Sequence, residues 1–121
     1  DCACVGRSTC NGTSCIAVEM SLMTWNVTNL CFDGETTELR FFDLQNGLVW
    51  PDSTIGPYLL PPGASASHTV ECITRTSVCF GAQQPFHGLY WGVDIDGSQP
   101  CSSCCFTCAT ATVTVAPLNC L

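Results

Sequence analysis

Cysteine is the residue that most constrains how this chain can fold. Twelve of the 121 residues are Cys, a density typical of secreted domains stabilised by disulfides. The cytosol keeps thiols reduced, so we expect export to an oxidising, extracellular or cell-surface location. An even number allows every Cys to pair within the chain, although the sequence does not fix the partners. The candidate disulfide residues are Cys2, Cys4, Cys10, Cys15, Cys31, Cys72, Cys79, Cys101, Cys104, Cys105, Cys108 and Cys120.

Local spacing limits some of these pairings. Cys104 and Cys105 are adjacent, and a bond between them would be strained, so we expect them to reach two different partners. Cys72 and Cys79 flank a predicted tight reversal over 75–77, which favours a bond between them.

A metal site is the alternative use of the late cysteines. The run Cys101-Ser-Ser-Cys104-Cys105-Phe-Thr-Cys108 contains two overlapping C-x-x-C spacings, in which two sulfurs can converge on one ion. A structural zinc site usually needs two such pairs on separate turns, whereas Cys105 and Cys108 enter a predicted strand. We therefore predict no metal site and no cofactor.

The charge pattern excludes some partners and favours another. The chain has three Arg, no Lys and a net charge of −7, which excludes nucleic-acid binding because phosphates require clustered cations. No run of 18 apolar residues occurs, so no membrane span is predicted. Weakly charged strands with Thr ladders, such as Thr110, Thr112 and Thr114, form edges that are poorly protected from pairing. We therefore expect the chain to bind copies of itself as a homopolymer.

Alternation of apolar and polar residues predicts strands along most of the chain. One begins at Ile16, where Val18, Met20 and Leu22 alternate with their neighbours. Asn46-Gly47 predicts a hairpin turn into residues 48–50. Further strands are predicted over 39–42, 69–73, 89–95 and 105–115, and no window shows a helical stripe. The fold class is therefore all-β and disulfide-rich, with an antiparallel sandwich or barrel over residues 16–121.

Residues 1–15 differ from this domain because they have no apolar periodicity. We predict an irregular, Cys-rich N-terminal arm. In an extended arm Cys2 and Cys4 point to the same side, which makes them candidates for disulfides between subunits. Disulfides within the subunit would hold the arm equally well.

The layout resembles the cysteine-rich subunits of bacterial endospore appendages. The shared features are the arm with Cys2 and Cys4, the strand–Asn46-Gly47–strand element, the Pro62-Gly63 turn before 69–73, and late strands that carry Cys. The resemblance implies a jelly-roll-like β-sandwich whose arm cross-links to a neighbour in a fibre. It also implies that Cys2 and Cys4 donate these disulfides to acceptors on the late strands. The Cys cluster over 101–108 exceeds what such a subunit needs.

Catalytic chemistry finds little support in the sequence. His68 and His87 are the only imidazoles and belong to no nucleophile signature. Glu35, Glu38 and Asp43 could imitate the paired carboxylates of a glycosidase, but they surround a strand with no evident pocket. We predict no catalytic residue and no enzymatic activity. A hydrolase would require a His–carboxylate pair that the sequence does not reveal.

Two further features concern ligands and processing. Trp25, Trp50 and Trp91 could form a sugar-stacking platform, but core positions are the favoured interpretation. Asn11-Gly12-Thr13 and Asn26-Val27-Thr28 match the N-glycosylation pattern, so covalent glycans on Asn11 and Asn26 are expected if the producer has this pathway. The first residue, Asp1, is not an initiator Met, and we expect a presequence to have been removed.

The sequence thus predicts a structural subunit of a secreted, disulfide-stabilised fibre or surface layer that forms by self-assembly. The alternative is a monomeric, secreted, disulfide-rich binding module, either lectin-like or toxin-like. An exposed patch made by the Trp side chains would favour this alternative.

Overall fold

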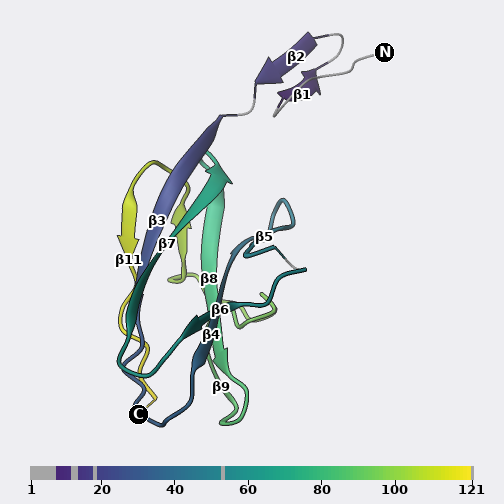
Figure 1. Cartoon of the computed structure of the whole chain (residues 1–121). Coiled ribbons are helices and arrows are strands. Elements are labelled where there is room, and N and C mark those ends of the chain that lie inside the picture. The colour runs from purple at the N-terminus through teal and green to yellow at the C-terminus, as the bar shows by residue number, and fades with distance from the viewer. Residues whose placement is uncertain (1–7, 12–13, 18, 53, 121) are drawn as a thin grey trace.

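The computed structural model describes residues 8–11, 14–17, 19–52 and 54–120. All regular structure in these ranges is strand (Figure 1), which confirms the predicted all-β, disulfide-rich class. The strands are β1 (Ser8–Asn11), β2 (Ser14–Ala17), β3 (Met20–Thr28), β4 (Thr37–Asp43), β5 (Leu48–Trp50), β6 (Tyr58–Leu60), β7 (Ser65–Ile73), β8 (Ser77–Gln84), β9 (Leu89–Gly92), β10 (Cys105–Thr107) and β11 (Thr112–Thr114). None of the described segments is a helix with the length and hydropathy needed to cross a bilayer.

The larger sheet is antiparallel and is built on the central pair β4 and β8. The outer side of β4 pairs with β5 near one end and with β6 near the other. The outer side of β8 is shared in the same way by β10 and β9. Both central strands are therefore flanked on each side, and their inward side chains form the larger sheet's part of the core.

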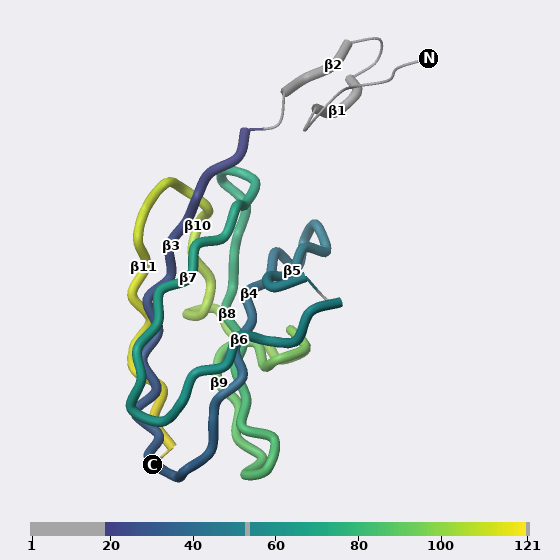
Figure 2. Tube along the Cα trace, viewed as in Figure 1, coloured from purple at the N-terminus to yellow at the C-terminus, as the bar shows by residue number. Residues whose placement is uncertain are grey.

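The smaller sheet has the order β11-β3-β7. β3 and β7 pair antiparallel over nine positions, from Met20↔Ile73 to Thr28↔Ser65. β11 runs parallel to β3, an exception that the antiparallel pattern did not predict. The two sheets face each other as separate layers (Figure 2).

Aromatic side chains from both sheets fill the space between these layers. Trp25 of β3 is fully buried, and its ring lies 5.0 Å from that of Phe41 on β4 and 6.3 Å from that of Phe80 on β8. Burial of each such side chain stabilises the fold by about 2–3 kcal/mol. The core interpretation of Trp25 is therefore confirmed.

The register of β3 differs from the simplest interpretation of its sequence. Ser21, Met23, Trp25 and Val27 point inward, whereas Leu22 is 56 % exposed. The apolar set predicted from Ile16, which includes Leu22, therefore does not form the buried face of β3. Trp25 has the largest apolar surface on this strand, and a one-residue slip would expose it.

The predicted strand over 105–115 is in fact two strands in different sheets. β10 pairs with β8 in the larger sheet, and β11 pairs with β3 in the smaller sheet. Between them the N–H of Cys108 donates to the carbonyl of Thr76, and its sulfur bonds to Cys72. The chain crosses between layers here, and the alternating pattern does not show the break because it continues on both sides.

Other predicted turns are confirmed, although one strand is shorter than expected. Gly47 and Gly63 have positive φ angles of 68° and 77°, as the Asn46-Gly47 and Pro62-Gly63 turns require. The strand predicted over 89–95 ends at Gly92, which has a φ of 65°. A Cβ on Gly92 would collide with the carbonyl of Phe80, so the chain turns at this glycine.

The described part of the N-terminal arm is ordered as a hairpin. β1 and β2 pair antiparallel from Ser8↔Ala17 to Asn11↔Ser14, with Cys10 opposite Cys15 in the register. The prediction of irregular structure is therefore wrong for these residues. Cys2 and Cys4 lie outside the described residues.

Four disulfides join the eight cysteines between residues 19 and 120. The bonds are Cys31–Cys120, Cys72–Cys108, Cys79–Cys105 and Cys101–Cys104. The expected bond between Cys72 and Cys79 is wrong, because these residues lie on strands of different sheets. The expectation that Cys104 and Cys105 have different partners is confirmed. These bonds indicate an oxidising compartment and occupy every sulfur of the C-x-x-C run.

The disulfides should contribute unequally to stability. Cys72–Cys108 spans 36 residues and Cys101–Cys104 spans only 3. In the chain-entropy description, the free energy of unfolding should fall by about 4 kcal/mol in C72A/C108A and by about 2 kcal/mol in C101A/C104A. Urea unfolding of both double variants measures the difference, and equal losses would contradict a loop-entropy origin.

Candidate functional site

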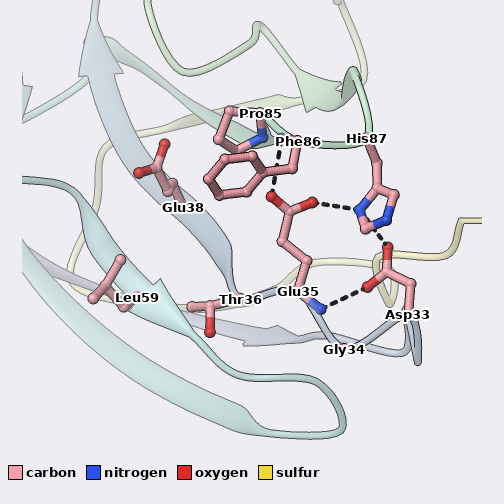
Figure 3. Close-up of a pocket in the computed structure, with 9 residues that line it drawn as sticks. All are labelled: Asp33, Gly34, Glu35, Thr36, Glu38, Leu59, Pro85, Phe86 and His87. Atoms are coloured by element: carbon pink, nitrogen blue, oxygen red, sulfur yellow. Dashed lines mark hydrogen bonds and ion pairs between the residues drawn. The ribbon is translucent and has the colours of Figure 1, made fainter.

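An acid–histidine cluster lies at one end of the sandwich (Figure 3). Asp33 and Glu35 come from the loop between β3 and β4, and His87 comes from the turn between β8 and β9. His87 Nδ1 is hydrogen-bonded to Glu35 Oε1 and lies 3.3 Å from Asp33 Oδ2. The side chains of Glu35, Asp33 and His87 are 10, 20 and 45 % exposed. The cluster is thus sheltered on its acidic side and open at the imidazole.

The second oxygen of each carboxylate is fixed by other donors. Glu35 Oε2 accepts a hydrogen bond from the N–H of Phe86 at 3.0 Å. Asp33 Oδ1 accepts from the N–H of Glu35 at 3.1 Å and from Gln84 Nε2 at 3.2 Å. Both carboxylates are therefore oriented before any ligand arrives, and each directs its other oxygen toward His87.

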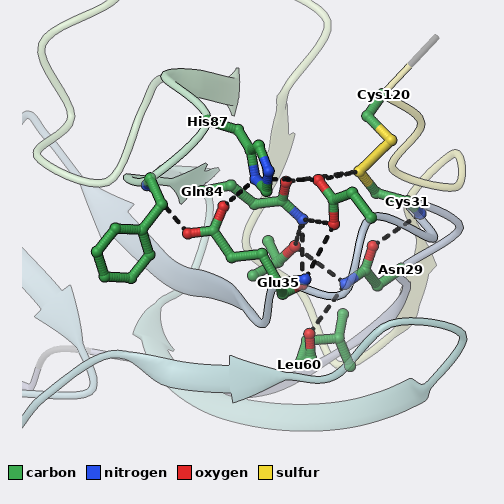
Figure 4. A network of polar contacts seen from close by, with 10 residues as sticks. Asn29, Cys31, Glu35, Leu60, Gln84, His87 and Cys120 are labelled. Carbon is green, nitrogen blue, oxygen red and sulfur yellow. Dashed lines mark hydrogen bonds and ion pairs between the residues drawn. A yellow bond between two sulfur atoms is a disulfide. The ribbon is translucent and has the colours of Figure 1, made fainter.

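A buried polar network supports this arrangement from below (Figure 4). Gln84 is fully buried, and its amide also donates to Thr37 Oγ1 and to the carbonyl of Glu35. Asn29 donates to Thr37 Oγ1 and accepts from the N–H of Cys31, which is bonded to Cys120. Buried networks of this kind fix side-chain positions because each lost bond is costly.

A cavity of about 480 Å³ adjoins the cluster. Its wall includes Glu38, whose carboxylate accepts from Gln83 Nε2, and the exposed side chains of Leu59 and Phe86. Asp43 does not line the cavity, because it is buried and accepts hydrogen bonds from Asn46 in its own turn. Of the three carboxylates considered from the sequence, Glu35 and Glu38 are thus brought together and Asp43 is not.

The sequence missed the His–carboxylate contact. Glu35 and His87 are 52 positions apart, and no local pattern connects them. The only indirect signal is that Glu35 precedes β4 and His87 follows β8, the two strands of the central pair. The contact depends on the antiparallel pairing of β4 with β8, which brings the start of one strand to the end of the other.

The other histidine has a different environment. The ring of His68 stacks on that of Tyr58, with centroids 3.9 Å apart. Burial lowers the pKa of His68 and raises the pKa of Tyr58. No ion pair of His68 occurs among the described residues.

The tryptophans do not form an exposed platform in the described structure. Trp25 is fully buried, and Trp50 and Trp91 are partly buried against the same core. The indole N–H of Trp91 donates to the carbonyl of Asn119. The three Trp side chains therefore do not form the exposed patch that would have favoured a sugar-binding module.

A second candidate site is the pair of open edges on the smaller sheet. β7 and β11 each pair only with β3 in the described structure. The N–H of Asn29 donates to Ala64 and the N–H of Thr74 donates to Glu19, which fixes the alternation of the β3–β7 ladder. The backbone groups of Ser65, Ser67 and Thr69 consequently point away from β3, toward the open edge.

The hydrogen bonds between β11 and β3 show in the same way which backbone groups of β11 face the open edge. Ala111 accepts from the N–H of Thr24, and the N–H of Val115 donates to Asn26. The backbone groups of Thr112 and Thr114 therefore point outward. Hydroxyl pairs such as Thr24–Thr69 and Thr28–Ser65, at 2.9 and 2.8 Å, cover the outer face between the two edges.

The glycosylation candidates are placed only in part. Asn26 lies on this outer face, where its side-chain oxygen accepts from the Ser67 hydroxyl. Asn11 belongs to β1. Its modification, like that of Asn26, stays a prediction.

No protein-family model, no curated protein and no solved structure matches this chain. The resemblance to endospore appendage subunits therefore stays a prediction.

The partly buried ring of His68 should make stability depend on pH. Because burial lowers the pKa of His68, the unfolded chain binds a proton at this residue more readily than the folded chain. The free energy of unfolding should therefore fall as pH drops below the ordinary histidine value of about 6.5. Urea unfolding from pH 7 to pH 5, with His68→Phe as the comparison, should show a smaller fall in the variant. A titration midpoint of the His68 ring above 6.5 in NMR spectra would contradict the prediction.

Proposed function

We propose that this chain is the structural subunit of a secreted, disulfide-stabilised fibre or surface layer that forms by self-assembly. Its role would be mechanical rather than enzymatic: adhesion, surface protection or connection between cells. The observation that carries the proposal is the pair of open backbone edges on β7 and β11, neither of which contains Lys or Pro.

Neither edge carries Lys or Pro, the residues that most directly block pairing with another chain. Soluble monomers place Lys, Pro or a bulge on an edge strand, or cover it. β11 contains only Thr112, Val113 and Thr114. β7 contains neither Lys nor Pro over its nine residues, and its one acidic residue, Glu71, lies near the end that leads to Ile73. Such edges accept an added strand through backbone hydrogen bonds.

The strand directions suit growth in one direction. β7 is antiparallel to β3 and β11 is parallel to it, so β7 and β11 run antiparallel to each other. Copies in the same orientation can therefore join β7 of one to β11 of the next in an antiparallel ladder. Such a head-to-tail contact leaves a free edge at each end and generates an open polymer.

Covalent cross-linking would involve the N-terminal arm. The resemblance implied acceptors for Cys2 and Cys4 on the late strands, but Cys101, Cys104, Cys105 and Cys108 are all bonded within the subunit. That assignment of the acceptors is wrong for this chain. We propose instead that Cys2 and Cys4 of neighbouring subunits bond to each other outside the cell. Glycans on Asn11 and Asn26 would be an optional modification.

The monomeric binding module remains the second candidate because of the cavity beside the acid–histidine cluster. Phe86 is 91 % exposed at its rim, as a ligand-contacting aromatic would be. The partial burial of Trp50 and Trp91 argues against the lectin-like form of this alternative.

Electrophoresis in detergent, combined with negative-stain microscopy of the native material, tests the proposal. We expect fibres or layers on the grid and high-mass species that collapse to 12.9 kDa on reduction. A single band at that mass without reductant, and no polymer on the grid, would favour the monomeric module.

A pair of variants at one residue tests the role of the β7 edge. Ser67→Pro removes the outward N–H, whereas Ser67→Ala keeps it, and both lose the hydroxyl contact with Asn26. We expect Ser67→Ala to polymerise like the native chain and Ser67→Pro to stay monomeric under the same conditions. Near-ultraviolet circular dichroism confirms that both are folded. Equal polymerisation of two folded variants would show that this edge is not used.

A further inference from the structure

We propose that Asp33, Glu35 and His87 form a binding site for a divalent transition-metal cation, of which zinc is the best fit. The prediction of no metal site rested on the late cysteines, and no local pattern connects these three residues because they come from two distant segments. One ligand atom from each residue lies within 4.8 Å of the other two. This site is independent of the proposed assembly function, because it lies outside the β7 and β11 edges.

The distance between His87 and Asp33 fits a small cation that takes nitrogen and oxygen ligands. His87 Nδ1 and Asp33 Oδ2 are 3.3 Å apart, close to the separation of about 3.3 Å between two ligands in a tetrahedral zinc site with bonds of about 2.0 Å. Glu35 Oε1, which is hydrogen-bonded to His87 Nδ1 at 2.5 Å, would have to move away from Nδ1 when both atoms bind the metal. Calcium prefers an all-oxygen set of six to eight ligands, so the imidazole favours zinc. Two carboxylates and one imidazole leave the fourth position to water.

A shortage of hydrogen-bond donors on the buried side points independently to a cation. Asp33 Oδ2 lies 3.1 Å from Cys31 Sγ, and Gln84 Oε1 lies 3.5 Å from the same sulfur. Cys31 is bonded to Cys120, so this sulfur carries no hydrogen to donate. Gln84 is fully buried, and its amide oxygen therefore has no donor among the described residues. A buried acceptor without a donor is costly, and a bound cation with its water would relieve this deficit.

The charge balance also favours a cation. Among the described residues, the ion pairs of Asp33 and Glu35 are both with His87. Arg40 instead donates to the carbonyl of Ile55. Arg75 lies in the turn between β7 and β8, at the opposite end of β8 from His87. The two carboxylates thus share one imidazole that is charged only when protonated.

The supporting contacts are those of a built metal site. Ligating carboxylates in proteins are held by hydrogen bonds to their second oxygens. Phe86 N–H, Glu35 N–H and Gln84 Nε2 supply these bonds here. On metal binding, Nδ1 would exchange its hydrogen bond to Glu35 for the metal, and the ring would be neutral with its proton on Nε2. A charged imidazolium would release its Nδ1 proton to solvent, whereas a neutral ring protonated on Nδ1 would lose that proton to solvent and take one up on Nε2.

Isothermal titration of the purified 121-residue chain with zinc chloride tests the site. We expect one zinc per chain, with affinity at least about tenfold lower in His87→Ala and in Glu35→Gln. Two controls should bind like the native chain. His68→Ala removes the only other imidazole, and Glu38→Gln removes a carboxylate from the same cavity without removing a proposed ligand.

X-ray absorption of the zinc-loaded native chain gives a result that does not depend on a variant. Nitrogen and oxygen ligands without sulfur are expected. Sulfur coordination, undiminished affinity in His87→Ala, or no zinc binding at millimolar concentration would each overturn the proposal. None of these outcomes bears on polymer formation, so the two proposals can fail separately.

Discussion

Two disulfides three residues apart fix the point where the chain passes between its sheets. Cys105 is bonded to Cys79 on β8 in the larger sheet, and Cys108 is bonded to Cys72 on β7 in the smaller sheet. The segment between these two residues therefore crosses from the larger sheet to the smaller sheet. β11 follows this crossing, pairs with β3 in the parallel direction and forms one edge of the smaller sheet.

The opposite end of the sandwich is held by a third bond and by buried polar groups. Cys31–Cys120 ties the last residues to the loop after β3. Asn29 accepts the N–H of Cys31 and, with Gln84, holds the hydroxyl of Thr37. The same loop positions Asp33 and Glu35, so the acid–histidine cluster depends on a covalent bond that lies beneath it. The disulfide stabilises the end of the fold and also supplies a sulfur with no hydrogen to donate.

The sequence predicts local features of this fold better than distant ones. Asn46-Gly47 encodes its own hairpin, because the positive φ and the strand alternation lie within a few residues. The break between β10 and β11 was not predictable from alternation, since no Gly or Pro interrupts residues 105–115. The Cys72 and Cys79 pairing failed for a similar reason: proximity in sequence does not reveal that the two strands belong to opposite sheets. The His87 and Glu35 contact needs the complete β4–β8 register, which no short pattern contains.

The low charge of the chain connects the two proposals. With three Arg and no Lys, few side chains can shield an edge strand or neutralise a carboxylate. The edges of β7 and β11 are left with backbone groups that another strand can satisfy. Asp33 and Glu35 are left with one shared imidazole, a deficit that a divalent cation can satisfy. The internal disulfides stabilise the fold independently of these groups. The open strand edges and the acidic cluster can therefore persist in the folded chain.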